Sequence, residues 1–155
     1  MDLLSLENPV FRLYLACSAL CVLKVMGQGW MTVLRMMQDK GGFASPEDLR
    51  PGLLNRHPDP AQLGLHDRVD RSRRMHRNDL ENIPAFWAAG LGMVAVDAAL
   101  WLAQVTMIGF VLARAAHAVA YATAQSHEIR SVPYTIGSVL VIVMALVVLG
   151  RLFFA

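Results

Sequence analysis

The sequence has 155 residues, of which 55% are hydrophobic, and a formal net charge of only +2. A soluble domain of this length is rarely so apolar, and its mean hydropathy of +0.43 favours an integral membrane protein. The small net charge, and basic residues that lie beside apolar runs without interleaved aromatic residues, argue against nucleic-acid binding.

Long apolar stretches predict the fold class, an all-α membrane bundle. At about 20 residues for each span, the sequence predicts four transmembrane helices over residues 9–37, 78–99, 100–124 and 131–154. Asp97 marks the expected turn between the second and third helices. Short connections favour a single up-down domain over residues 1–155. The exception is a loop over about 38–77, in which Ser45 and Pro46 predict the N-cap and first residue of a short helix.

The distribution of charge predicts the orientation of the chain. The N-terminus carries Asp2 and Glu7 rather than a basic segment, so no cleavable signal peptide is expected. Eight of the fourteen Lys and Arg residues lie between Lys40 and Arg77. The positive-inside rule therefore places this loop in the cytoplasm and both termini on the other side of the membrane.

Cys17 and Cys21 are the only cysteines, four residues apart on the first predicted helix. This spacing gives neither a disulfide framework nor a CxxC metal motif, so we predict no metal site and a packing role for both thiols. Thiol chemistry is then expected to come from a bound ligand.

A polar cluster precedes the second apolar run. Arg74, Asn78 and Glu81 share one helical face, and Arg77 and Glu81 are spaced as an i,i+4 pair. Charged groups at a membrane helix indicate a functional site, and this mixture suits a small zwitterion with carboxylate and amine groups. The alternative is a basic anchor whose side chains reach the lipid headgroups.

Polar residues also interrupt the later helices. Arg114, His117 and Tyr121 recur on one face of the third helix, and Arg130 and Tyr134 do so on the fourth. One small subunit has little room to enclose these groups, which favours a homo-oligomer. The alternative is that they form hydrogen bonds between helices.

Four blocks of the sequence, 43–48, 74–82, 114–121 and 129–135, carry a family resemblance. They resemble the membrane-associated proteins in eicosanoid and glutathione metabolism, in the branch of microsomal glutathione transferases and microsomal prostaglandin E synthase. The resemblance implies a homotrimer of four-helix subunits with glutathione bound between neighbours, open to the cytosolic side. His117 disfavours the leukotriene-type branch, which has aromatic residues at this position.

By position, the resemblance also implies the functional residues. Arg130 and Ser131 are expected nearest the thiol, and Asp48 matches an aspartate implicated with that arginine in the synthase branch. The implied glutathione ligands are Arg35, Arg74, Arg77, Asn78, Glu81, His117, Tyr121, Arg130, Ser131 and Tyr134.

The expected chemistry follows from the charge of Arg130. A free thiol has a pKa of about 8.5, which a nearby cation lowers, and an arginine keeps its charge at every working pH. Together with this charge, the resemblance implies a detoxifying glutathione transferase of the bacterial inner membrane or endoplasmic reticulum, acting on apolar electrophiles, with lipid hydroperoxide peroxidase or prostaglandin E synthase-like isomerase activity as further options. The alternative is a non-catalytic lipid-binding or accessory membrane protein of the same fold.

Overall fold

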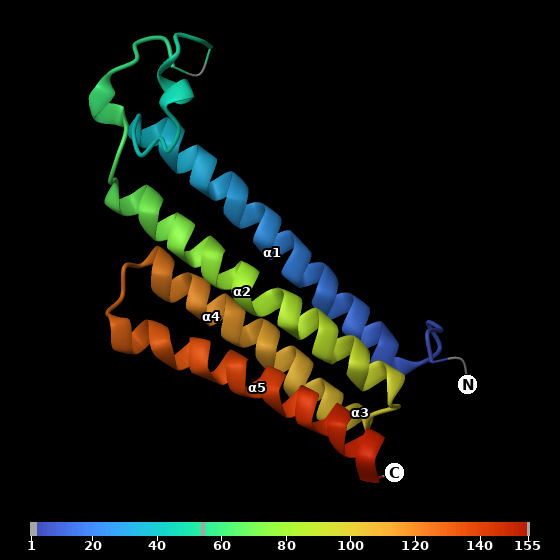
Figure 1. Ribbon diagram of the computed structural model, residues 1–155. Helices are drawn as coiled ribbons and strands as arrows, with labels where there is room; N and C mark the ends of the chain where they lie inside the picture. Colours follow the sequence, from blue (N-terminus) through green and yellow to red (C-terminus); the bar gives the residue numbers. More distant parts are fainter. Residues whose placement is uncertain (1–2, 54, 155) are drawn as a thin grey trace.

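The computed structural model describes residues 3–53 and 55–154, which fold into four long helical rods that lie side by side (Figure 1). The third rod is continuous but has three parts, α3, the π-helical segment η3, and α4. The elements are α1 (Pro9–Asp39), α2 (Asp67–Ala95), α3 (Leu100–Ala103), η3 (Gln104–Ile108), α4 (Gly109–Ala122) and α5 (His127–Phe154). The predicted all-α four-helix architecture is confirmed.

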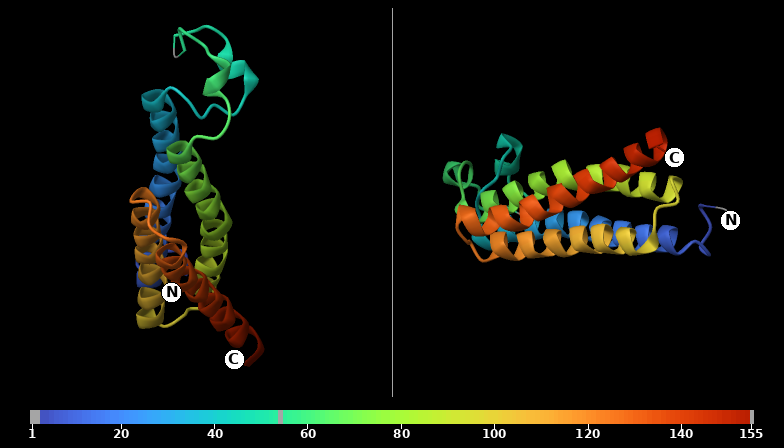
Figure 2. Two further views of the ribbon diagram at one scale, coloured as in Figure 1. Left: turned by 90° about the vertical axis from the view of Figure 1, so that its left-hand side faces the viewer. Right: turned by 90° about the horizontal axis from the view of Figure 1, so that it is seen from below.

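The connections alternate between the two ends of the bundle. Segment 40–66 and the turn at 123–126 lie at one end, called here the loop end, and both termini lie at the other (Figure 1). Figure 2 shows the rods from two further sides; α1 packs on α2, α2 on α5, and α4 on α5. Asp97 lies in the turn after α2 with a φ of 50°, as the sequence predicts.

Polar caps fix both ends of α1. The side chain of Asn8 accepts a hydrogen bond from the backbone N–H of Val10 at 2.9 Å, which satisfies one of the free donors of the first turn. At the other end Lys40 adopts the left-handed conformation, with a φ of 48°, and its N–H donates to the carbonyl of Met36. The helix therefore extends to Asp39, two residues past the predicted range of 9–37.

The predicted start of the second helix at residue 78 is wrong, because α2 begins at Asp67. Residues 67–77 are too charged to be recognised by hydropathy, yet Val69, Ser72 and Met75 face the bundle at a spacing of three and are buried. Asp67 and Asp70 in the first turn suit the helix N-terminus. The loop consequently spans 40–66 rather than 38–77.

Two further boundaries differ from the prediction. The second helix ends at Ala95 rather than 99, and α5 begins at His127, one turn before the predicted start at 131. By length and composition, three helices of the described residues could cross a membrane: α1, the rod Leu100–Ala122, and α5. The fourth expected span, on α2, is long enough but not apolar enough to be counted, because its first half is charged.

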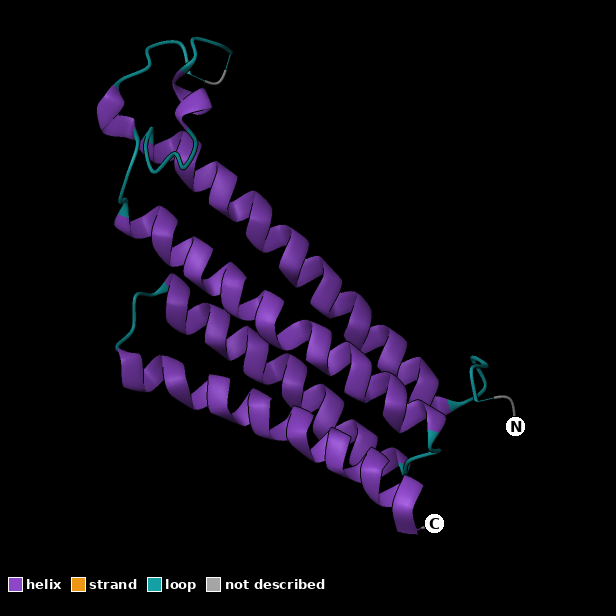
Figure 3. Ribbon diagram, viewed as in Figure 1, coloured by secondary structure: helices purple, strands orange, loops and turns teal. Residues whose placement is uncertain are grey.

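The loop contains two short 3-10 helices, η1 (Pro46–Leu49) and η2 (Pro60–Gln62), and Ser45 and Pro46 begin the first as predicted (Figure 3). Gly42 has a φ of +71°, and a Cβ atom there would lie 2.9 Å from the Cβ of Val69. A side chain at this position would therefore push the loop away from α2.

The apolar core lies between the polar residues of α2 and the end that bears the termini. Phe86 and Phe110 stack with ring centroids 4.5 Å apart and an interplanar angle of 3°. Met93, Met107 and Met144 close around them with no exposed surface. Polar side chains therefore collect in the half of the bundle nearer the loop end.

Candidate functional site

A pocket of about 210 Å³ lies near the loop end, where α2, α4 and α5 meet. It combines an amide from α2 with ring, cationic and hydroxyl groups from α4 and α5. Its lining residues are Asn78, His117, Tyr121, His127, Arg130, Ser131 and Tyr134. Six of these seven are among the predicted glutathione ligands, so folding brings together residues that are far apart in the sequence.

The last turns of α4 place two rings side by side. His117 and Tyr121 are one turn apart, and their ring centroids are 4.8 Å apart with an interplanar angle of 52°. Tyr134, on the second turn of α5, lies with its ring centroid 6.4 Å from that of His117. The short turn at 123–126 makes this possible, because it returns the chain directly antiparallel to α4.

Arg130 has its cation fixed against this aromatic group. Its guanidinium carbon lies 4.7 Å from the centroid of the Tyr121 ring, within cation–π range. Its Nε also donates to the carbonyl of Ser126 at 3.3 Å. The remaining guanidinium N–H groups have no partner among the described residues, so the charge is positioned but retains donors for an anion.

Ser131 lies beside Arg130, and its hydroxyl donates to the carbonyl of Glu128 at 2.8 Å. This is a hydrogen bond to a carbonyl of the preceding turn, of the type that Ser forms within helices. Donation from Ser131 to a thiolate therefore requires the hydroxyl to rotate away from Glu128.

Behind the pocket, a buried ion cluster joins three helices. Asp79 of α2 has no exposed surface and forms ion pairs with Lys24 of α1 and with Arg114 of α4, the latter at 2.5 Å. Arg114 is 1% exposed and reaches Asn78 Oδ1 at 2.7 Å and His117 Nδ1 at 3.1 Å. The cluster thus contacts the pocket through two of its lining residues.

The remaining α2 residues of the predicted site point elsewhere. Arg74, Arg77 and Glu81 are exposed, and the described residues include no ion pair between Arg77 and Glu81 at a distance up to 4.0 Å. The predicted i,i+4 pairing is therefore not formed. These three side chains belong to the outer face of α2 and are not brought to the pocket within one chain.

Arg35 and Asp48 also lie outside the pocket. Arg35 is near the end of α1, where Arg68 and Arg71 repel it, and its buried Nε has no hydrogen-bond partner among the described residues. Asp48 is exposed on η1 and accepts from the backbone N–H of Ser45 at 3.4 Å. In one chain Asp48 caps a short helix and does not approach Arg130.

Sequence reasoning assigned no role to Asp79 or Lys24. A signal was present, because each is a charged residue near the middle of a long helix, where burial without a partner would be costly. The ion pair itself could not be predicted from helical spacing, because Lys24 and Asp79 are 55 positions apart in the sequence. Cys17 and Cys21 are buried and unpaired in the apolar core, as expected of packing residues.

The base of the loop is held by a capping interaction. The backbone N–H of His66 donates to Asp70 Oδ2 at 2.7 Å, and this hydrogen bond, with help from Arg73, lowers the pKa of the Asp70 carboxyl. Arg73 in turn donates to the carbonyl of Gly42 at 2.5 Å. The start of α2 is thereby joined to both ends of segment 40–66.

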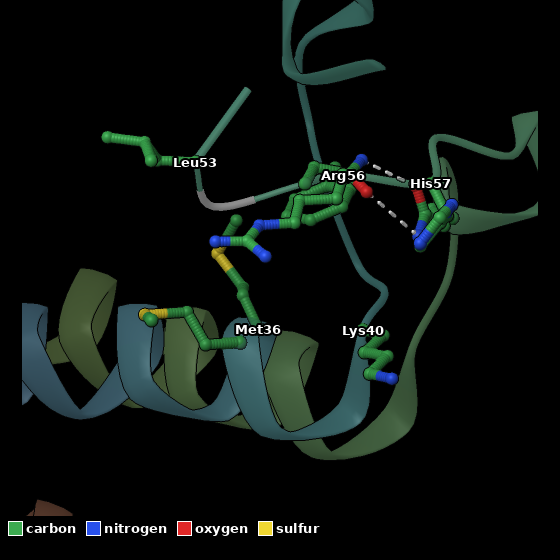
Figure 4. Close-up of a pocket in the computed structure, with 9 residues that line it drawn as sticks. Met36, Lys40, Leu53, Arg56 and His57 are labelled. Atoms are coloured by element: carbon green, nitrogen blue, oxygen red, sulfur yellow. Dashed lines mark hydrogen bonds between the residues drawn. The ribbon is translucent and has the colours of Figure 1, made fainter. Parts of the chain in front are cut away.

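A second pocket, of about 290 Å³, lies between this loop and the end of α1 (Figure 4). Hydrogen bonds between Asn55 and Gln62 hold its outer wall, and Figure 4 shows the side chain of Arg56 extending across it above Met36. None of the residues that line this second pocket belongs to the predicted site, although Asp48 lies in the same loop. A third, apolar pocket of about 970 Å³ lies on α4 and α5 and is lined by Ala116, Val132 and Ile136 among others.

Comparison with known proteins shows the family of the chain. Residues 14–150 match the model of the MAPEG family. The chain is 32% identical over 146 residues to prostaglandin E synthase from Homo sapiens, which covers 94% of this chain and 92% of that protein. It is 33% identical over 132 residues to microsomal glutathione S-transferase 1 from Bos taurus, covering 85% and 84%. The chain therefore belongs to the MAPEG family, a family of helical membrane proteins whose matched relatives here are enzymes.

Proposed function

We propose that this protein is a membrane-bound glutathione transferase that holds glutathione as its thiolate for attack on apolar electrophiles. The observation that carries the proposal is Arg130, a permanent cation stacked on Tyr121 with free donors beside Ser131 and Tyr134. A cation next to a thiol favours the deprotonated form, which is the nucleophile.

The proposed reaction is nucleophilic substitution or addition at carbon. The thiolate sulfur forms a bond to the electrophilic carbon; with an aryl halide, halide leaves and the thiol proton is released to solvent. Arg130 acts by stabilising charge that is already present on the sulfur, and Ser131 donates a hydrogen bond once its hydroxyl leaves the Glu128 carbonyl. Apolar electrophiles would reach the sulfur from the surrounding lipid.

Glutathione has carboxylates and an ammonium in addition to its thiol, and one chain supplies only part of their partners. Among the described residues that line the pocket, Arg130 is the one arginine or lysine, whereas Arg74, Arg77 and Glu81 face outward on α2. We propose that the outer face of α2 of a neighbouring subunit completes each site, with Arg35 and Asp48, in a homotrimer. In that assembly arginines bind the carboxylates and Glu81 binds the ammonium.

The proposed orientation follows from the basic residues of the loop end. Segment 40–66 and the charged first half of α2 would lie in the cytoplasm, so the pocket would open to cytosolic glutathione. The membrane would be the bacterial inner membrane or the endoplasmic reticulum, the membranes across which the rule operates.

The test is an assay of detergent-solubilised protein with glutathione and a chromogenic aryl halide. Rapid mixing with glutathione alone should give thiolate absorbance at neutral pH, and addition of the halide should give product at a rate proportional to enzyme. Thiolate formation without turnover on any electrophile would favour the non-catalytic lipid-binding or accessory protein instead.

A second candidate function is isomerisation of a lipid endoperoxide, favoured by the similarity to prostaglandin E synthases over most of the chain. In this reaction the thiolate would form an S–O bond with one endoperoxide oxygen as the O–O bond breaks, and the other oxygen would take a proton. Loss of the proton on the carbon that bears the S-bound oxygen would then form the ketone and expel the thiolate, so glutathione is regenerated. Reduction of lipid hydroperoxides would begin from the same thiolate but consume glutathione. Measuring glutathione consumed for each product formed separates these activities.

A further inference from the structure

The contacts of Arg114 determine the protonation pattern of His117. A guanidinium has donors only, so in the 3.1 Å contact between Arg114 Nη2 and His117 Nδ1 the arginine must donate. His117 Nδ1 is therefore an acceptor without a proton. The remaining proton of a neutral imidazole lies on Nε2, at the side of the ring away from Arg114.

Asp79 is what holds Arg114 in this position. Its Oδ1 accepts from Arg114 Nε at 3.1 Å and from Nη2 at 2.5 Å, which fixes the plane of the guanidinium. The same Nη2 lies 2.7 Å from Asn78 Oδ1. The two N–H groups of Nη2 thus serve three acceptors, on Asp79, Asn78 and His117. A small rotation of the guanidinium would break the hydrogen bond to His117 first, because it is the longest of the three.

The charges of the cluster disfavour a protonated His117. Lys24 and Arg114 contribute two positive charges and Asp79 one negative charge, so the buried cluster is already net positive. A proton on Nδ1 would also point at a donor of Arg114. The other ionisable side chains that line the pocket with His117 are Tyr121, His127, Arg130 and Tyr134, and none of these four is a carboxylate.

We propose that Asp79 and Arg114 are positioning residues that keep His117 a neutral imidazole with an Nε2–H donor on the pocket side. His117 then donates a hydrogen bond to the bound anion. It cannot act as a general base, because its one ring nitrogen without a proton, Nδ1, already accepts a hydrogen bond from Arg114. The identity of that anion, glutathione, rests on the proposed function; the tautomer does not.

The direct test is nitrogen NMR of the full-length protein in detergent with ¹⁵N-labelled histidine, in which protonated and unprotonated ring nitrogens have well-separated shifts. The His117 signals are assigned by their loss in His117→Gln. We expect Nε2 protonated and Nδ1 unprotonated at neutral pH. A protonated Nδ1, or an imidazolium, would overturn the proposal even if the protein is an active transferase.

The role of Asp79 is tested with Asp79→Asn, which keeps the shape and removes the charge. Loss of the fixed guanidinium should let His117 populate both tautomers. Lys24→Met is the matched control, because it removes a charge from the same cluster but leaves every bond of Arg114 in place; its tautomer should match the unmodified protein. Equal tautomer preference in all three proteins would mean that Asp79 is structural only.

A pair of His117 variants tests the donor while Lys24, Asp79 and Arg114 all remain in place. The amide nitrogen of Gln reaches the place of Nε2, whereas that of Asn reaches only the place of Nδ1. The kcat of His117→Asn should lie about tenfold below that of His117→Gln, the value of one hydrogen bond. Equal large losses in both would identify His117 as a base and overturn the proposal, whereas an unmodified protein that never uses glutathione would refute the proposed function and leave the NMR result standing.

Discussion

The guanidinium of Arg130 lies over the ring of Tyr121, 4.7 Å from its centroid, so that the first turn of α5 is joined to the last turn of α4. This contact lets a charged side chain remain near the end of a membrane bundle without an ion pair. It also leaves guanidinium donors free beside Ser131. The same contact therefore serves packing and, by our proposal, thiolate binding.

Replacing Arg130 by leucine should reduce turnover far more than glutathione binding. If the cation lowers the pKa of the bound thiol by two units, from about 8.5 to about 6.5, its loss costs about 2.7 kcal/mol, and the thiolate fraction and turnover at pH 7 should fall about 25-fold. The rate should recover partly as pH rises, because solvent then deprotonates the thiol. The assay is steady-state turnover across pH. Arg130→Lys keeps the charge but loses the planar guanidinium that stacks on Tyr121. Its turnover should lie between those of the unmodified protein and Arg130→Leu. Normal turnover of Arg130→Leu at pH 7 would assign activation to another arginine.

Glu81→Gln should weaken glutathione binding without affecting the stability of the subunit. Glu81 is exposed and forms no ion pair with any residue that the structure describes, so its loss leaves no buried charge behind. A lost hydrogen bond to a charged ligand group should weaken binding by about tenfold or more. Calorimetric titration with glutathione and a melting curve provide the two readings, and Glu7→Gln at the opposite end of the bundle is the control. Unchanged affinity would make the α2 cluster an interfacial anchor.

Native mass spectrometry in mild detergent should show a three-subunit species, and glutathione should remain bound to that species alone. The reason is that Arg74, Arg77 and Glu81 face away from the pocket of their own chain. Reversing the charge of this face with Arg77→Glu should lower glutathione binding, whereas Arg151→Gln, near the termini, should not. Monomers that bind glutathione fully would contradict a site between subunits.

Asp70→Asn should destabilise the start of α2 at neutral pH but not in acid. The folded pKa of Asp70 is lowered, chiefly by the His66 N–H, so the carboxylate stabilises the fold above its ordinary pKa of about 3.9 and loses that effect as pH falls through the lower folded value. Melting temperatures of the two proteins should differ at pH 7 and converge toward pH 3. Asp67→Asn, in the same turn but with no side-chain hydrogen bond among the described residues, should show a smaller difference, because it loses only the interaction with the helix N-terminus. A constant gap at every pH would mean that charge is not the cause.

Sequence by itself determined the fold class, the family and most of the pocket. Long apolar runs predict the helices, because a chain in lipid must pair its backbone N–H and C=O groups with one another. Helical spacing placed His117 and Tyr121 on one face of α4, and Arg130 and Tyr134 on one face of α5, before any packing was considered. These are local relationships, and local geometry follows from residue order.

Tertiary structure alone decided what depends on distant parts of the chain. The early start of α2 at Asp67 rests on burial of Val69, Ser72 and Met75 against other helices, which overrides their charged neighbours. The junction of Lys24, Asp79 and Arg114 needed three helices at one depth, and burial made each charge require the others. Hydropathy reads each residue singly, whereas the free energy of a buried charge depends on its partner, and only the packed bundle supplies that partner.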